Sequence, residues 1–556
     1  MTNRFTRRQA VLGVSSTLLL PAACSQTPLL RGQAEAVFAH GVASGDPDTT
    51  SVVIWTRVSG SRQPVTVDWF VAKDPEMLDV VADGQFTTDA QRDYTVKPVV
   101  EGLQPGEQYF YQFVVNDLSS PVGSTKTLPV GHVESLVLAI ATCSNYPFGW
   151  FNAYEVIAND DEVDLVVHLG DYIYEYRVRG GYGGDTGRRI GRNHKPGHEV
   201  VSLDDYRTRH AQYKTDPGSL AMHSRHPLIV IWDDHESANN PWMEGAENHQ
   251  LNEGSWVDRR AASMQAYYEW MPIRDPGPGG TWEQYWRHFK FGDLASVITL
   301  ESRHTGRSEQ ITWGKRLDGF RNAAEGKEFY ANVVGSPDRN MLSADMEDFL
   351  QSELAESVES GRRWRIIGNQ SVMARMKMPR LDDPFFTDLK RELGRTAGNL
   401  LDDLTRLGEL ELHGDLDAWD GYPAARERFY QIAKDAGAHD LLVVSGDSHS
   451  YWANALYDAN GASMGVELGS TGITSPRSLL SIGDEGLSRW EELAVAANKE
   501  IVWVEGHYRG FIRLEVTHDG AHADFVTVTN VESRDYEKKI VHSMDIESSN
   551  GNLRYV

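Results

Sequence analysis

Cysteine and positive charge are both scarce in this chain. Two cysteines occur among 556 residues, Cys24 and Cys143, so a framework of several disulfide bonds is excluded. Lys and Arg number 54 against 80 Asp and Glu, which gives a formal net charge of −26. Such a chain lacks the positive field that attracts a phosphate backbone, so nucleic acid is not expected as a specific partner. An anionic substrate would need local positive charge, and bound metal ions are the obvious source.

Long apolar runs are also missing. The run 11–20 is shorter than the roughly 20 residues of a membrane helix, and it lies between a cationic start and small residues. Residues 1–30 are therefore predicted to be a signal peptide. The pair Arg7-Arg8 after Thr6 indicates the twin-arginine export machinery, which carries folded proteins. We expect a periplasmic or secreted protein, and we expect it to be a monomer.

The first cysteine leaves the mode of anchoring open. Cys24 follows Leu-Pro-Ala-Ala, as at a lipoprotein cleavage site, but Pro21 stands where an aliphatic residue is usual. A lipid anchor at Cys24 and a soluble product are both compatible with this segment. Loss or lipidation of Cys24 would leave Cys143 alone in an oxidising compartment. Cys143 is then either a buried, inert thiol or a metal ligand.

The remaining chain divides by its apolar pattern. Residues 38–130 alternate in short stretches such as Val65–Val71 and Tyr109–Val115, which predicts a fibronectin-III/Ig-like β-sandwich with a tyrosine corner at Tyr109. Residues 131–530 instead contain short continuous apolar runs, typical of strands buried on both faces between helices. This predicts an α/β catalytic domain. Residues 531–556 are a polar tail without a predicted structure.

Four of the apolar runs in 131–530 end in polar clusters. The clusters are Thr142–Asn145, Gly170–Tyr174, Asp233–Glu236 with Asn239 and Asn240, and Ser445–His449. An aspartate after a strand is often only a helix cap, but four such clusters in one chain favour a shared crevice at the carboxyl ends of the strands.

The side chains of these clusters can be sorted by the metals they prefer. A thiolate, an imidazole and a phenol suit a transition metal, whereas carboxylate and amide oxygens suit a harder cation such as calcium. This predicts an iron-type group beside an oxygen-rich group, with the carboxylate of Asp171 shared between them. The iron-type group comprises Cys143, Asp171, Tyr174 and His449, and the oxygen-rich group comprises Asp171, Asn239 and Asp447.

The motifs that carry these residues resemble those of a known family. Gly-Asp-x-x-Tyr at 170–174 is similar to the metal signature of purple acid phosphatases. The fuller set resembles the alkaline phosphatase D, or PhoD-like phosphatase, family. That set is Gly41–Asp46, Cys143, Gly170–Tyr176, Trp232–Glu236, Asn239-Asn240, Asp420–Pro423 and Ser445–His449.

The resemblance implies a four-layer metallophosphatase fold of two mixed β-sheets flanked by helices, preceded by the sandwich. It also implies Fe³⁺ on Cys143, Asp171, Tyr174 and His449, and one or two Ca²⁺ on Asp171, Asn239 and Asp447. Asn240 is a close rival of Asn239. The implied activity is hydrolysis of small phosphate esters by water activated on the metals. Glu301-Ser302-Arg303 departs from the family's Asp-Thr-Arg, and the loop 177–200 is also unusual, which leaves substrate preference open.

Three further residues are candidates for catalysis. His235 is either a general acid for the leaving group or a residue that supports the ligands. Arg207 and Arg209 could hold phosphate oxygens, or could lie on a helix surface with Asp204 and Asp205. The alternatives to a monoesterase are a phosphodiesterase acting on lipids or teichoic-type polymers, and a catalytically inactive envelope protein.

Overall fold

The structure is a computed structural model that describes residues 28–277, 279–477, 479–549 and 551–556. The predictions for Arg7, Arg8 and Cys24 fall outside these residues. Within them, no helix combines the length and the apolar character that crossing a membrane requires.

The N-terminal part consists of two packed sheets preceded by α2 (Pro28–Val37). One sheet contains β3 (Val65–Ala72), β4 (Val80–Thr88), β7 (Gln108–Val115), β8 (Leu118–Ser119) and β9 (Gly123–Lys126). Facing it are β1 (Val42–Gly45), β2 (Ser51–Arg57), β5 (Thr95–Val96) and β6 (Val99–Glu101), and the two sets of strands share one apolar core. The Tyr109 hydroxyl accepts a hydrogen bond from the Gln104 amide at 2.9 Å, as in a tyrosine corner.

The second of these sheets is continuous with the main sheet of the chain. β1 pairs in parallel with β12 (Leu228–Val230), with Gly45 opposite Leu228. The resulting 11-stranded sheet runs in the order β25-β24-β23-β22-β10-β11-β12-β1-β2-β5, and β6 pairs with β2. Its other strands are β10 (Ser135–Ala141), β11 (Leu165–His168), β22 (Arg509–Thr517), β23 (Ala521–Val528), β24 (Lys538–Ser549) and β25 (Asn552–Tyr555).

The last two of these strands correct the boundary that the sequence suggested. β24 pairs with β23 and β25 pairs with β24, so the segment after residue 530 continues the sheet instead of forming a polar tail. The sequence of this segment is mostly polar because most of β24 is exposed or half-buried, and only Ile546 of this strand is fully buried.

A seven-stranded sheet packs against the first. Its order is β15-β16-β17-β18-β20-β19-β21. The strands are β15 (His288–Phe291), β16 (Ala295–Thr299), β17 (Trp364–Gly368), β18 (Leu441–Ser445), β19 (Tyr451–Tyr457), β20 (Ser463–Gly469) and β21 (Ile501–Glu505). A shared apolar core joins the two sheets, with contributions such as Leu138 and Ile140 from β10 and Leu442 and Val444 from β18. Both large sheets contain parallel and antiparallel pairs.

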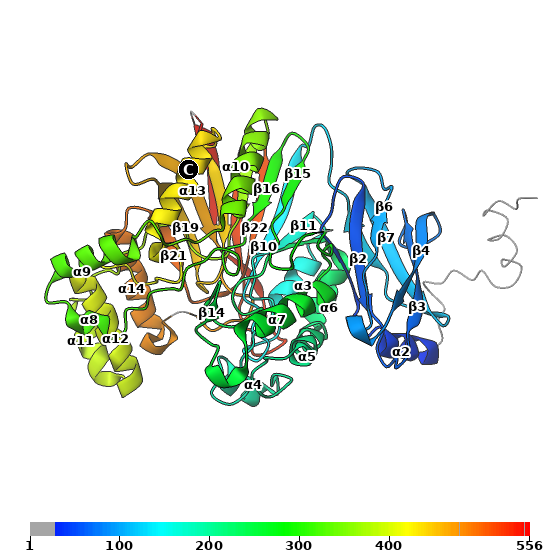
Figure 1. Ribbon diagram of the computed structural model, residues 1–556, viewed down its shortest axis with the longest axis horizontal. Coiled ribbons are helices and arrows are strands. Elements are labelled where there is room, and N and C mark those ends of the chain that lie inside the picture. Colours follow the sequence, from blue (N-terminus) through cyan, green and yellow to red (C-terminus); the bar gives the residue numbers. More distant parts are fainter. Residues whose placement is uncertain (1–27, 278, 478, 550) are drawn as a thin grey trace, which may run out of the picture.

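Helices cover the outer faces of both sheets (Figure 1). The first sheet is covered by α3 (Asn152–Ala158), α5 (Leu203–Tyr213), α6 (Pro217–Arg225) and α7 (Trp256–Trp270). The second is covered by α10 (Ala344–Glu359) and α13 (Pro423–Asp435). Because β10 sends Leu138 and Ile140 toward one layer and Ala139 and Ala141 toward the other, its sequence is apolar from Leu136 to Ala141.

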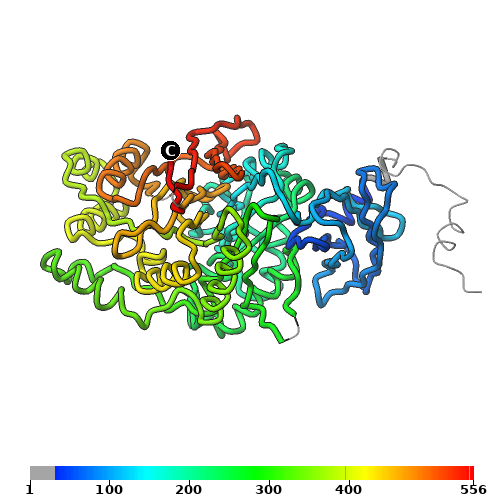
Figure 2. Tube along the Cα trace, turned by 90° about the horizontal axis from the view of Figure 1, so that it is seen from above, coloured from blue at the N-terminus to red at the C-terminus, as the bar shows by residue number. Residues whose placement is uncertain are grey.

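The remaining elements extend the molecule at the end far from the N-terminal module (Figure 2). There α8 (Arg316–Gly319), α9 (Ala323–Phe329), α11 (Pro384–Glu392), α12 (Arg395–Leu410) and α14 (Gly483–Ala497) surround a separate apolar cluster. Between them and the N-terminal module lie the loops that follow β10, β11, β12 and β18. Shorter elements near those loops are α4 (Gly184–Ile190), β13 (Pro241–Trp242) and β14 (Gly245–Ala246).

Candidate metal centre

Polar loops leave β10, β11, β12 and β18 at the same edge of the two sheets. Adding a side chain at Gly170 would bring it to 2.4 Å from the Asp233 backbone nitrogen, so the loops after β11 and β12 are in close contact. A side chain added at Gly446 would likewise come to 2.5 Å from the Thr142 hydroxyl, so the loops after β18 and β10 are also in close contact. Glycine is needed at both positions because a larger residue would push the loops apart.

Four of the predicted ligands adopt a left-handed backbone conformation. The φ angles are 58° at Cys143, 56° at Asp171, 63° at Asp447 and 55° at His449. A non-glycine residue rarely adopts this region, and such strain concentrates at functional sites. The surrounding packing must therefore fix these side chains toward the shared edge.

The predicted iron-type residues come together. The ligating atoms of Cys143, Asp171 and His449 lie within 4.8 Å of one another, and all three residues are buried. The Tyr174 hydroxyl lies 2.8 Å from Asp171 Oδ2 and 3.3 Å from His449 Nε2. It also lies 2.5 Å from the Ser475 hydroxyl. A thiol, a carboxylate, a phenol and an imidazole thus face one point.

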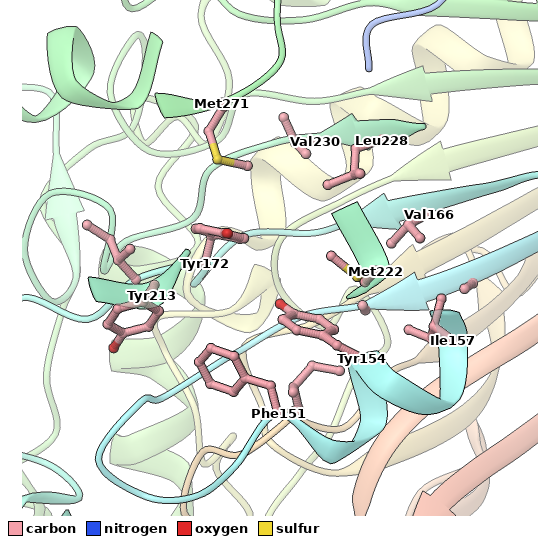
Figure 3. Close-up of a cluster of buried hydrophobic side chains, with 14 of the residues drawn as sticks. Phe151, Tyr154, Ile157, Val166, Tyr172, Tyr213, Met222, Leu228, Val230 and Met271 are labelled. Carbon is pink, nitrogen blue, oxygen red and sulfur yellow. The ribbon is translucent and has the colours of Figure 1, made fainter. Parts of the chain in front are cut away.

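The neighbouring layer fixes the loop that carries Asp171. Tyr172 points away from the cluster and packs with Tyr154 and Met222 between the strands and helices (Figure 3). Its hydroxyl lies 2.8 Å from His223 Nε2, and its backbone amide donates to Glu236 Oε1 at 2.5 Å. The alternation of Asp171 and Tyr172 therefore places one side chain in the site and the next in the core.

The electrostatics of the cluster fit a bound cation. Burial raises the pKa of the Cys143 thiol well above its ordinary value, and the nearby Asp171 raises it further. Burial likewise raises the pKa of Asp171, as do Asp234 and Asp233. Burial and Asp233 raise that of Asp447. So many buried acidic groups cannot all ionise without a compensating positive charge, and a metal ion would supply it.

A second group shares Asp171 with the first. The ligating atoms of Asp171, Asp234 and His235 also lie within 4.8 Å of one another. Within the described residues, Asp234 Oδ1 and Asp233 Oδ2 are buried without a hydrogen-bond partner. The predicted ligand groups did not include Asp234, and the geometry makes it a further candidate ligand. In the sequence, the indication of this group was the order Asp-Asp-His at 233–235, directly after the apolar run 228–232.

His235 is held by a buried carboxylate. Its Nδ1 lies 2.7 Å from Glu175 Oε2, and its Nε2 lies 3.9 Å from Asp234 Oδ2. Its ring stacks on Tyr174 with centroids 4.2 Å apart. Burial opposes protonation, but Asp234, Glu175 and Asp171 together raise the pKa of His235 well above its ordinary value. Glu175 thus fixes the ring so that Nε2 faces the carboxylates.

The two adjacent asparagines have different partners. Asn239 Oδ1 accepts a hydrogen bond from the Tyr176 hydroxyl at 2.9 Å. Asn240 donates its backbone amide to Asp234 Oδ2 at 2.9 Å and its side-chain amide to Glu247 at 2.8 Å. Both are half-buried. The assignment of Asn239 to the oxygen-rich group stays a prediction.

A buried arginine, Arg303, lies between acidic side chains that come from three different loops of the site. Arg303 forms ion pairs with Asp233 and, at 2.6 Å, with Asp417, and its NH2 lies 3.8 Å from Asp447 Oδ2. Glu301, the departure from the family pattern, accepts hydrogen bonds from the backbone amides of Arg303 and His304 at 2.8 Å each. Glu301 therefore shapes the loop that positions Arg303 beside the predicted ligand Asp447.

The two arginines that could hold phosphate, Arg207 and Arg209, both contact protein groups in the structure. Arg207 forms an ion pair with Glu269 at 2.7 Å and donates to the Gln91 carbonyl of the N-terminal module at 2.6 Å. Arg209 is fully buried and donates to backbone carbonyls, among them those of Tyr174 and Tyr176. Both guanidinium groups are thus engaged by protein acceptors, and Arg209 supports the backbone of the loop that carries Tyr174.

The unusual loop contributes a residue that the sequence did not single out. Tyr182 donates its hydroxyl to the Pro476 carbonyl at 3.0 Å, and the same oxygen lies 3.1 Å from His449 Nδ1. The two rings stack at 5.9 Å. Because the hydroxyl hydrogen of Tyr182 goes to Pro476, its oxygen accepts a hydrogen bond from His449 Nδ1. The Nε2 nitrogen then faces Tyr174 and Asp171, so Tyr182 orients this imidazole. A tyrosine in a glycine-rich loop carries no local signal for this role.

The fold and the convergent loops define the class of protein. The family model of PhoD-like phosphatases matches residues 138–525, and the model of their N-terminal domain matches residues 23–129. The chain belongs to the PhoD-like phosphatase family and is a phosphoric ester hydrolase.

Two relatives support this assignment over most of the chain. The chain is 33% identical over 503 residues to alkaline phosphatase D of Bacillus subtilis (strain 168), covering 88% of this chain and 77% of that protein. The solved structure of PhoD superposes with a TM-score of 0.74 and 30% identity, and the match covers 94% of this chain and 92% of that one.

Proposed function

We propose that the chain is an exported phosphatase that uses an Fe³⁺ and Ca²⁺ centre to release inorganic phosphate from small phosphomonoesters. The observation that carries the proposal is the convergence of Cys143, Asp171, Tyr174 and His449 from three different strand ends. A thiolate and a phenolate beside an imidazole suit ferric iron better than magnesium or calcium.

The residues divide the work in the following way. Cys143, Tyr174 and His449 would hold iron, Asp171 would be shared between the two cations, and Asp447 with Asn239 would offer oxygens to calcium. When bound, the metals supply Lewis-acid charge that neutralises phosphoryl oxygens and activates water. Asp234 adds a carboxylate close to Asp171, which makes it a further oxygen donor for the second cation.

The chain's own groups then orient the reaction. Glu175 holds His235 Nδ1, which leaves Nε2 at the edge of the cluster. We assign this nitrogen the role of donor to the departing oxygen of the ester. Tyr182 fixes His449 and Arg303 separates the carboxylates of Asp233 and Asp447, so the charged groups keep their positions when the phosphate enters.

Export and location form part of the same proposal. The pair Arg7-Arg8 supports twin-arginine export to the periplasm or beyond, because that route carries proteins that have already folded around their metals. We propose a monomer, with lipidation at Cys24 as the way in which it could be anchored. Mass spectrometry of the exported protein would show whether Cys24 is retained and carries lipid.

The metal assignment is tested by comparing the wild-type enzyme with Tyr174→Phe. Elemental analysis of the wild type should give iron and calcium, and its visible spectrum should contain a phenolate-to-iron band. Tyr174→Phe should lose this band. An enzyme that is active, lacks iron and has no such band would contradict the proposal.

The substrate class is tested on the same wild-type preparation. Rates on p-nitrophenyl phosphate and on bis(p-nitrophenyl) phosphate are measured side by side at equal concentration. A faster monoester reaction supports the proposal. A faster diester reaction would instead support the phosphodiesterase alternative, and turnover of neither ester by protein loaded with both metals would contradict the proposed substrate class.

A further inference from the structure

Two histidines and an aspartate meet at the end of the sheets opposite the catalytic loops. His132 Nδ1 lies 3.0 Å from Asp293 Oδ2, and His518 Nε2 lies 3.4 Å from Asp293 Oδ1. The two imidazole rings are stacked, with centroids 5.0 Å apart and planes 15° from parallel. One ligating atom of each residue lies within 4.8 Å of the others.

Three separate turns bring these side chains together. His132 precedes β10, and His518 follows β22, whose Thr517 pairs with Ser135 at the start of β10. Asp293 lies in the turn between β15 and β16 of the seven-stranded sheet. Because the catalytic loop follows the other end of β10, this cluster is separated from the phosphatase centre by the length of a strand.

The backbone fixes the carboxylate in place. The Asp293 amide donates to the Gly131 carbonyl at 2.8 Å, and Asp293 Oδ1 accepts from the Val133 amide at 3.0 Å. The preceding Gly292 has a φ of 49°, and a side chain there would come within 2.2 Å of the Gly131 carbonyl oxygen. The close approach of the two turns therefore depends on this glycine and positions Asp293 beside His132.

One nitrogen of the cluster has no hydrogen-bond partner. His518 Nε2 is buried, and no donor or acceptor among the described residues satisfies it. It faces the Asp293 carboxylate at a separation longer than a good hydrogen bond. A buried polar atom without a hydrogen-bond partner requires an explanation, and a bound ion is one of the established ones.

We propose that His132, Asp293 and His518 form a second metal site, which binds a divalent transition metal of the zinc type. Two imidazoles and one carboxylate are ligands that zinc prefers, and a water molecule would complete a tetrahedral set. The His132, Asp293 and His518 side chains are 67%, 44% and 37% exposed, so an ion can enter from solvent. Their donor set contains no thiol or phenol, which separates this site from the proposed iron centre.

The site would connect the two sheets and the N-terminal module. Asp293 lies in a turn of the seven-stranded sheet, and His518 lies in the turn after β22 of the 11-stranded sheet. His132 lies in the segment that joins β9 of the N-terminal module to β10. A bound ion would therefore hold three parts of the chain together, and its role is structural.

The proposal is tested on the exported enzyme with its native metals in place. Zinc is added in equilibrium dialysis, and bound metal is counted by elemental analysis for the wild type, His132→Ala, His518→Ala and the double variant. His198→Ala is the matched control, because its side chain is also 67% exposed and lies 2.9 Å from a single aspartate, Asp205.

The wild type and His198→Ala should bind one more zinc equivalent than the double variant. Each single variant should bind this equivalent at least about tenfold more weakly, since loss of a ligand costs no less than loss of a supporting residue. All variants should keep the wild-type phosphatase rate, which shows that they are folded. Equal zinc stoichiometry in the wild type and the double variant would overturn the proposal, as would an equal loss in His198→Ala.

Discussion

Replacing Asp171 by asparagine separates the chemical role of this residue from its role in the fold. Asp171 is fully buried and belongs to both groups of candidate ligands. Its Oδ2 accepts a hydrogen bond from the Tyr174 hydroxyl at 2.8 Å, and its Oδ1 accepts from the His235 amide at 3.4 Å. Asparagine has almost the same shape and keeps one acceptor, so the packing should survive.

The expected losses follow from the charge. A metal ion contributes several kcal/mol of transition-state stabilisation, and a loss of about 4 kcal/mol corresponds to a rate reduced about 10³-fold. Removing the shared carboxylate weakens both metal groups at once, so kcat/KM should fall by about this factor or more. Iron and calcium content should fall with it.

Asp171→Asn should lower the activity but should not lower the stability of the metal-free protein. Burial and the neighbouring Asp234 and Asp233 raise the pKa of Asp171, so an ionised Asp171 opposes folding when no cation is bound. Urea unfolding after chelation should therefore give Asp171→Asn a midpoint equal to or above that of the wild type. Unchanged activity, or an unfolding midpoint that falls together with the activity, would refute this reasoning.

Glu467→Gln is the matched control for a buried carboxylate. Glu467 is fully buried like Asp171, but protein donors satisfy it, among them the amides of Met373 and Ala374 at 2.6 and 3.0 Å. This variant should lose about 1–3 kcal/mol of stability, because the amide nitrogen of glutamine cannot accept the hydrogen bond made to the carboxylate oxygen that it replaces. It should retain its metals and its rate per folded molecule.

Two further predictions concern residues around the centre. Tyr182→Phe removes the hydroxyl beside His449 Nδ1, so metal affinity or turnover should fall about 10- to 100-fold, and unaltered iron occupancy and kcat would contradict a positioning role. Arg207→Ala should leave kcat/KM within about twofold of the wild type, because Glu269 and the Gln91 carbonyl already engage this guanidinium. A large rise in KM for phosphate esters would restore Arg207 as a phosphate-binding residue.

Much of the site could be predicted because its residues lie where strands end. Cys143, Asp171 and His449 each follow a continuous apolar run, and the carboxyl ends of neighbouring strands lie together in a layered fold. Tyr174 follows at a fixed distance from Asp171. The chemical difference between a thiol, a phenol and a carboxylate then sorted the groups without knowledge of their distances.

The features that the sequence did not reveal are contacts that local sequence does not encode. Arg207 and Arg209 occupy a helix in a polar setting, but their acceptors come from α7, the N-terminal module and the loop 174–196. Tyr182 reaches His449 across 267 positions of sequence. The final strands were missed because a sheet edge with one solvated face keeps few apolar residues.

The pairing of β1 with β12 has a consequence for dividing the protein. Gly45 lies opposite Leu228, Asp46 donates its amide to the Leu228 carbonyl at 2.9 Å, and Trp55 donates to the Glu269 carbonyl at 2.8 Å. A fragment starting near residue 131 would leave the backbone of β12 at an open edge, where another polypeptide could add a strand. Proteolysis between the two parts should therefore yield aggregation-prone material instead of an autonomous phosphatase.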